Sequence, residues 1–157
     1  MPLYNSMQDG LNSLLDNKVL LVPLVAWLTA QALKVIVALI RDRRLDFSYI
    51  ISMGGMPSSH TTLVCALTTT IAVLYGLSSP LFAIAAIFAV IVMYDAAGVR
   101  KEVSNQSTLL NRMLDELFKG QPEFEERLKE LIGHTKLEVL AGALLGIVFG
   151  LVLTPIW

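Results

Sequence analysis

Seven ionisable residues lie inside or beside strongly apolar segments of this sequence, where charge is normally avoided. Placing an ionised side chain in hydrocarbon costs free energy, so such residues usually mark a functional site. The two histidines can attack phosphorus or transfer a proton near neutral pH. The three cations suit an anionic ligand, and a carboxylate can orient an imidazole. The set comprises Lys34, Arg41, His60, Asp95, Arg100, His134 and Glu138.

The stretch GGMPSSHTT places His60 directly before an apolar run. Either Ser58 or Ser59 is a good N-cap for a helix that begins there. The exposed amides of its first turn and the helix dipole form an anion site, and Gly55 lets the backbone approach a ligand closely. We therefore expect a phosphate, or an anion of the same shape, beside His60. A satisfied histidine at the membrane interface is the simpler alternative.

Lys34 and Arg41 share one stripe of a predicted helix because they are seven residues apart. Together with Arg100 and the first-turn amides, they would surround a bound phosphoryl group. Each cation also has a simpler explanation. Lys34 can extend to the interface, and Arg41 can act as a signal for membrane orientation. Asp95 and Arg100 can form a structural pair between two spans.

His134 precedes Glu138 by four residues, so the carboxylate reaches the imidazole if the helix begins by Gly133. The carboxylate would then hold one ring nitrogen while the other attacks phosphorus. An ordinary pair at a helix start is the alternative. The same helix face continues with small residues at four-residue spacing, which let another helix approach closely. These residues are Gly142, Gly146 and Gly150.

Long apolar segments must position these side chains. Of the 157 residues, 55% are hydrophobic and only 16% are charged, whereas soluble domains carry about 25% charged residues. A span needs about 20 mostly apolar residues. The near-zero net charge gives no reason to expect nucleic acid as a partner, and the single Cys65 excludes an internal disulfide. We predict an all-α integral membrane bundle in one domain, with about four spans at residues 19–40, 60–77, 80–99 and 137–157.

Lysine and arginine concentrate in two connections, 41–59 and 100–136. Because cytoplasmic loops are enriched in these residues, we expect both loops on the cytoplasmic side of the cell's inner membrane and both termini outside. Within the longer loop, residues 104–133 predict two short amphipathic helices, one ending at Gly120 and one opening at Pro122. These helices would lie on the membrane surface or on a neighbouring subunit of a homodimer.

Several of these motifs resemble those of a known family. Lys34 and Arg41 form K-x6-R, PSSH at residues 57–60 resembles P-S-G-H, and GHTKLEVLAGALLG resembles the end of S-R-x5-H-x3-D. Together they resemble the type 2 phosphatidic acid phosphatase superfamily, which also contains the vanadium haloperoxidases. The runs GGMPSSHTT and MYDAAGVRKE resemble the divergent branch of that superfamily more closely.

The resemblance implies roles for individual residues. His134 would be the phosphorylated nucleophile, Glu138 its orienting acid and His60 the general acid. The phosphate cradle would be formed by Lys34, Arg41 and Ser59. Asp95 and Gly55 would support the site.

The sequence also departs from the family pattern. Asp42 follows Arg41 where the family has proline, Ser59 replaces a glycine, and Glu138 replaces an aspartate. The serine–arginine pair before the last histidine is missing, and Arg100 would take the part of its arginine.

We therefore predict a metal-independent hydrolase that releases phosphate from a lipid phosphate or pyrophosphate through a phosphohistidine. It would need no cofactor, because the carboxylates are too few and scattered for a metal cage, and vanadate would inhibit it as a phosphate mimic. The alternative is a non-catalytic membrane protein that binds or moves an anionic lipid through the same cradle. Haloperoxidase activity is disfavoured because those enzymes are soluble and the chain shows no halide site.

Overall fold

The computed structural model describes residues 10, 12–42, 55–117 and 135–157, and the regular elements in these ranges are helical. This confirms the predicted all-α membrane bundle. The main elements are α2 (Lys18–Asp42), α4 (Ser59–Tyr75), α5 (Pro80–Tyr94), η1 (Asp95–Val99), α6 (Arg100–Leu117) and α7 (Lys136–Ile156).

Three helical stretches among the described residues are long and apolar enough to cross a bilayer: α2, α5 continued by η1, and α7. The fourth apolar helix, α4, has 17 residues, or about 25 Å of helix, slightly less than a ~30 Å hydrocarbon core. It ends earlier than the predicted span 60–77 because Gly76, at a φ of 80°, terminates it. Ser79 then caps α5 and Pro80 opens it.

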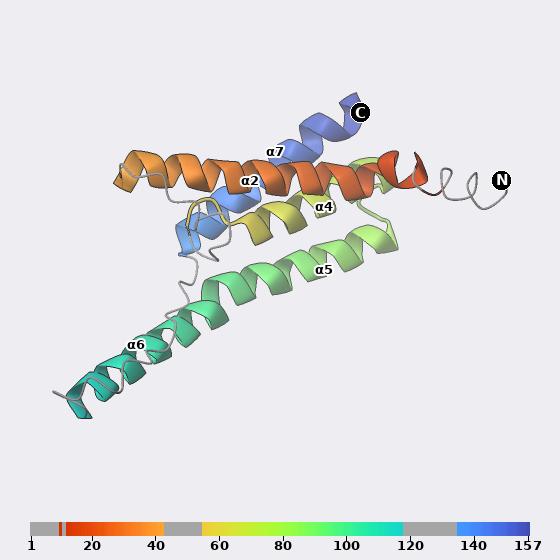
Figure 1. The fold of residues 1–157 in the computed structure, drawn as a ribbon. Helices are drawn as coiled ribbons and strands as arrows, with labels where there is room; N and C mark the ends of the chain where they lie inside the picture. The colour runs from red at the N-terminus through yellow and green to blue at the C-terminus, as the bar shows by residue number, and fades with distance from the viewer. Residues whose placement is uncertain (1–9, 11, 43–54, 118–134) are drawn as a thin grey trace, which may run out of the picture.

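The bundle is built around α4. This helix packs most extensively on α7 and also contacts α2 and α5. In Figure 1, α4 lies between α2 and α5, while α7 crosses behind α2. Small and hydroxyl-bearing residues let helices approach closely, and most buried residues of α4 are of this kind, namely Ser59, Thr61, Thr62, Ala66 and Thr70.

The glycines of α7 allow it to pack directly on the backbone of α4. A Cβ on Gly142 would collide with the carbonyl oxygen of Ser58, and one on Gly146 would collide with that of Thr62. Gly150, further along the same face, is equally crowded by α4. The small-residue stripe that predicted a packing seam therefore lies against α4 within one chain.

Hydroxyl groups join the helices further along the bundle. Thr154 Oγ1 donates to Thr70 Oγ1 at 3.2 Å, and both residues are buried. Lys18 Nζ donates to the carbonyl oxygen of Thr154 at 3.4 Å, and Thr68 Oγ1 donates to that of Ala85 at 3.1 Å. These bonds join α7 to α4 and to α2, and α4 to α5, where the apolar surroundings offer few other polar partners.

The third span continues into α6 without a break, so that one long helix runs from Pro80 to Leu117 and leaves the bundle (Figure 1). We expected a connecting loop from residue 100 and an amphipathic segment from residue 104. Instead, the chain passes through Gly98 as a π-helical turn, and α6 begins at Arg100. The second predicted amphipathic helix, with Gly120 and Pro122, lies outside the described residues.

Candidate functional site at the start of α4

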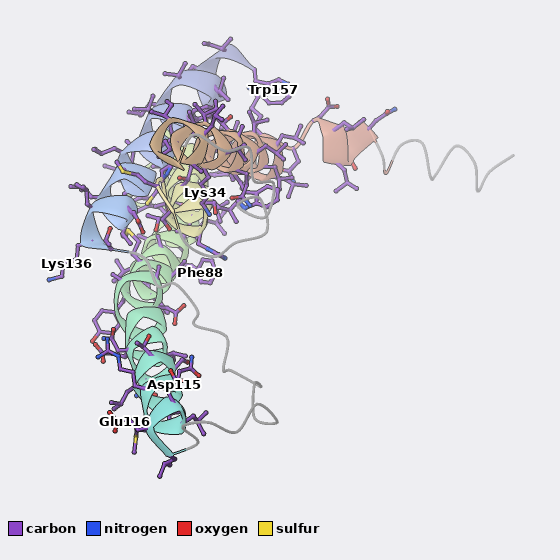
Figure 2. All side chains as sticks on the ribbon, turned by 60° about the vertical axis from the view of Figure 1, so that its left-hand side comes forward. Lys34, Phe88, Asp115, Glu116, Lys136 and Trp157 are labelled. Atoms are coloured by element: carbon purple, nitrogen blue, oxygen red, sulfur yellow. The ribbon has the colours of Figure 1, made fainter. Side chains whose placement is uncertain are left out.

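A buried lysine and a buried serine meet where α2 passes the beginning of α4. Lys34 Nζ donates to Ser59 Oγ at 3.0 Å, and each residue is only 2% exposed. The two residues are 25 positions apart in the chain. Figure 2 shows Lys34 within the bundle, whereas Lys136 points outward from the beginning of α7. The burial argues against a lysine that only extends to the interface.

Ser58 is the N-cap of α4, so Ser59 is its first helical residue. Ser58 Oγ accepts from the backbone N–H of Thr61 at 3.5 Å and from Thr61 Oγ1 at 3.0 Å. Its own backbone N–H donates to the carbonyl oxygen of Glu138 at 3.0 Å. The cap therefore fixes the first turn of α4 and also joins it to the first turn of α7.

Gly55 approaches the same cluster from the segment before α4. Its φ of 95° lies in the region that favours glycine. A Cβ on Gly55 would be 3.9 Å from Lys34 Cγ, so this backbone runs along the stem of the lysine. The glycine therefore serves the turn and the packing on Lys34, and its predicted close approach to a ligand stays a prediction.

Glu138 lies in the first turn of α7 and belongs to a capping box. Its Oε2 accepts from the backbone N–H of Thr135 at 3.0 Å, and Thr135 Oγ1 accepts from the backbone N–H of Glu138 at 3.3 Å. The Glu138 carboxylate also attracts the Lys34 ammonium electrostatically. Glu138 thus connects the beginning of α7 to the buried pair on α2 and α4.

The helical spacing predicted between His134 and Glu138 needs correction. We expected a helix that begins by Gly133, but Thr135 is the N-cap and α7 begins at Lys136. Helical i,i+4 geometry does not extend back to residue 134, because that residue precedes the cap. His134 itself lies outside the described residues, and its role as nucleophile stays a prediction.

The other predicted site residues are distributed as follows. His60 is the second residue of α4, is partly buried, and has a buried Nδ1 atom. Asp95 is partly buried and opens η1, a turn that contacts α7. Arg41 lies in the last turn of α2, and Arg100 is the first residue of α6. The positions of these two arginine side chains lie outside what the structure describes.

The structure therefore brings together Lys34, Ser58, Ser59, Gly55 and Glu138. The sequence interpretation missed Thr135, although Thr-x-x-Glu is a recognisable capping-box pattern. It also missed the fully buried Thr61, which supports the Ser58 cap and carries no signal of its own in the sequence.

The described residues contain no group of three or more His, Cys, Asp or Glu side chains that could hold a metal ion. What the cluster does offer is an ammonium group, hydroxyl groups and a helix N-terminus, the donors that suit an oxyanion.

These features define an α-helical membrane protein with a buried cation–hydroxyl cluster at a helix start. The model of the divergent PAP2 family matches residues 15–149, so the chain belongs to this family. The chain is also 44% identical over 151 residues to the uncharacterized membrane protein YuiD of Bacillus subtilis (strain 168), a match that covers 89% of this chain and 96% of that protein. No solved structure matches the chain.

Proposed function

We propose that this protein is a membrane-embedded phosphatase that hydrolyses a lipid phosphate or pyrophosphate. The observation that supports this most strongly is the buried Lys34–Ser59 pair at the N-terminus of α4. An ammonium group at membrane depth is expensive, and a helix N-terminus also attracts negative charge. Two sources of positive potential therefore converge on a place that suits a phosphoryl group.

The proposed reaction has two steps. A ring nitrogen of neutral His134 attacks phosphorus, the bond from phosphorus to the lipid oxygen breaks, and protonated His60 gives its proton to that oxygen. Water then attacks the phosphohistidine, the N–P bond breaks, and His60 accepts the proton of the water. Lys34, Arg41 and Arg100 would neutralise the charge on the equatorial oxygens during both transfers, with Ser58, Ser59 and the first-turn amides of α4 as further donors.

The proposed orientation places this site at the cytoplasmic face. The basic connections 41–59 and 100–136 flank the site residues, and such connections favour the cytoplasm. Both termini would then lie outside, and the substrate would come from the inner leaflet. Vanadate would inhibit the enzyme by occupying the position of phosphate.

Phosphate release from the purified full-length protein tests the proposal. Phosphatidic acid, a polyprenyl phosphate and a polyprenyl pyrophosphate are the substrates to compare. His134→Ala and Lys34→Met should abolish release, and His60→Ala should reduce it strongly, because proton transfer contributes about 10²–10⁴-fold. Lys18→Met is the matched control, since it removes a cation from the other end of α2. Full turnover by His134→Ala would exclude the mechanism.

A second candidate is a protein that binds or moves an anionic lipid without turnover. The observation that favours it is the capping box. Glu138 Oε2 accepts from the backbone at the start of its own helix, so this oxygen is engaged in the cap and not in orienting a nucleophilic histidine. Competition of vanadate with phosphatidic acid for binding, without any phosphate release from the substrates above, would support this candidate.

A further inference from the structure

We propose that the hydrocarbon chain of the bound lipid lies along one face of α4, the face formed by His60, Leu63, Leu67 and Leu74. This inference rests on the proposed lipid phosphate ligand and specifies where its apolar part binds. The phosphate would lie at the start of α4, beside Ser59 and His60, and the chain would continue from there toward Leu74.

The other faces of α4 are occupied by neighbouring helices. The α7 glycines lie on the backbone of Ser58 and Thr62. On the side of α5, Thr68 bonds the Ala85 carbonyl, and Cys65 Sγ lies 3.9 Å from Met93 Sδ. Ser59 faces α2 through its bond with Lys34.

The remaining face is opposite α7 and between α2 and α5. A helix turns about 100° per residue, which places residues 60, 63, 67 and 74 on this side and residues 58, 62, 65 and 69 on the side of α7. His60, Leu63 and Leu67 are partly exposed, and Leu74 is 41% exposed. Figure 1 looks onto this side of α4, with α2 and α5 flanking it. The exposed side chains of this face are apolar apart from His60, whereas hydroxyl groups of α4 contact the neighbouring helices α2, α5 and α7.

The position of His60 connects this apolar face to the polar cluster. Its imidazole belongs to the same stripe as Leu63 and Leu67, while the preceding residue, Ser59, contacts Lys34. Leu67 lies eight residues beyond Ser59, about 12 Å along the helix. A chain that begins at the cluster would therefore run past Leu63 and Leu67 toward the middle of the bilayer.

The depth of the cluster also favours a lipid over a soluble phosphate. α2 continues for eight residues beyond Lys34, or about 12 Å. This extension exposes Ile36, Val37, Leu39 and Ile40, side chains that suit hydrocarbon. The cluster consequently lies below the end of α2, at a depth where an anion arrives most readily when its own chain is embedded in the bilayer.

Photocrosslinking in vesicles tests this assignment. A benzophenone amino acid replaces Leu67 in the full-length protein, and Leu144 of α7, which is 57% exposed, is the matched control position. The vesicles consist of phosphatidylcholine with a minor share of phosphatidic acid. In separate samples, one lipid or the other carries the label in its hydrocarbon chains. The Leu67 probe should capture phosphatidic acid roughly tenfold better than phosphatidylcholine, the preference that one charge-assisted hydrogen bond supplies. Vanadate should remove this preference, and the Leu144 probe should show none.

Equal capture of the two lipids at Leu67 would overturn the inference even if the protein releases phosphate. Selective capture at Leu67 supports the inference even if no phosphate release is found, because crosslinking reports binding. A Leu67 probe variant that fails to fold is recognised by loss of capture of both lipids, and Leu67→Trp then replaces the probe. It should weaken phosphatidic acid binding roughly tenfold by blocking the face, and unchanged binding would contradict the assignment.

Discussion

The backbone N–H of Ser58 donates to the carbonyl oxygen of Glu138 at 3.0 Å and so connects the first turns of α4 and α7. Both partners are backbone groups, so changing the side chain of Ser58 or Glu138 does not remove either of them. It exists because Gly142, one turn further along α7, has no Cβ to push the Ser58 carbonyl away. The relative position of the two helix starts, and of the residues around them, depends on this contact.

Gly142→Ala should therefore disturb both stability and the site. The added methyl group collides with backbone at Ser58, and overpacking of this kind costs about 1–3 kcal/mol. Unfolding in detergent, followed through the fluorescence of the two tryptophans, measures the loss. Gly98→Ala is the control, because a Cβ there meets nothing within 4 Å. Equal stability of the two variants would show that the helices can separate at little cost.

The Lys34–Ser59 hydrogen bond should show energetic coupling. Ser59→Ala removes an acceptor from a buried ammonium group, and hydrogen bonds to charged groups contribute about 1.5–3 kcal/mol. In a double-mutant cycle with Lys34→Met, the coupling free energy should fall in the range of about 0.5–3 kcal/mol. Ser107→Ala on α6, combined with Lys34→Met, should give none. Additive effects of Ser59→Ala and Lys34→Met would contradict a direct interaction.

Thr154→Val should weaken the bundle without altering the site. The substitution removes the hydroxyl group that donates to Thr70, and interhelical hydrogen bonds in membranes average about 0.6 kcal/mol. Thr154 lies 16 residues from Glu138 along α7, about 24 Å away, so the rate of phosphate release per folded protein should match the wild type. A reduced rate at equal folded fraction would mean that the two ends of the bundle are coupled.

Local signals predicted most helix boundaries. Ser58 and the apolar run after it predict the start of α4, and the predicted span 80–99 begins at Pro80, where α5 begins. The length of the apolar runs also identified α2 and α7, because both helices are long and apolar enough to cross a bilayer.

Local signals failed where tertiary contacts or a competing cap determine where a helix begins or ends. The apolar run predicts that the third span ends at residue 99, yet the helix continues through η1 into α6. Thr135, rather than a residue near Gly133, begins α7 because its side chain pairs with the backbone of Glu138. For the candidate site, the predicted orientation of the chain in the membrane indicated only that Lys34 and Ser59 lie at the same depth. Their contact depends on how closely α2 packs on α4, which no spacing in the sequence encodes.

Cysteine labelling should establish the proposed orientation. Ser78, between α4 and α5, and Gln106, on α6, are both exposed. Ser78 precedes the long helix formed by α5, η1 and α6, and Gln106 lies 26 residues after its first residue, Pro80. These 26 residues correspond to about 39 Å, so the two positions emerge on different sides of a ~30 Å hydrocarbon core. In a Cys65→Ala background, a membrane-impermeant maleimide added to intact cells should label Ser78→Cys and leave Gln106→Cys unlabelled until the membrane is permeabilised. The wild-type protein, whose Cys65 is buried, should remain unlabelled under both conditions. Labelling of Gln106→Cys alone on intact cells would reverse the orientation and place the Lys34–Ser59 cluster at the outer face.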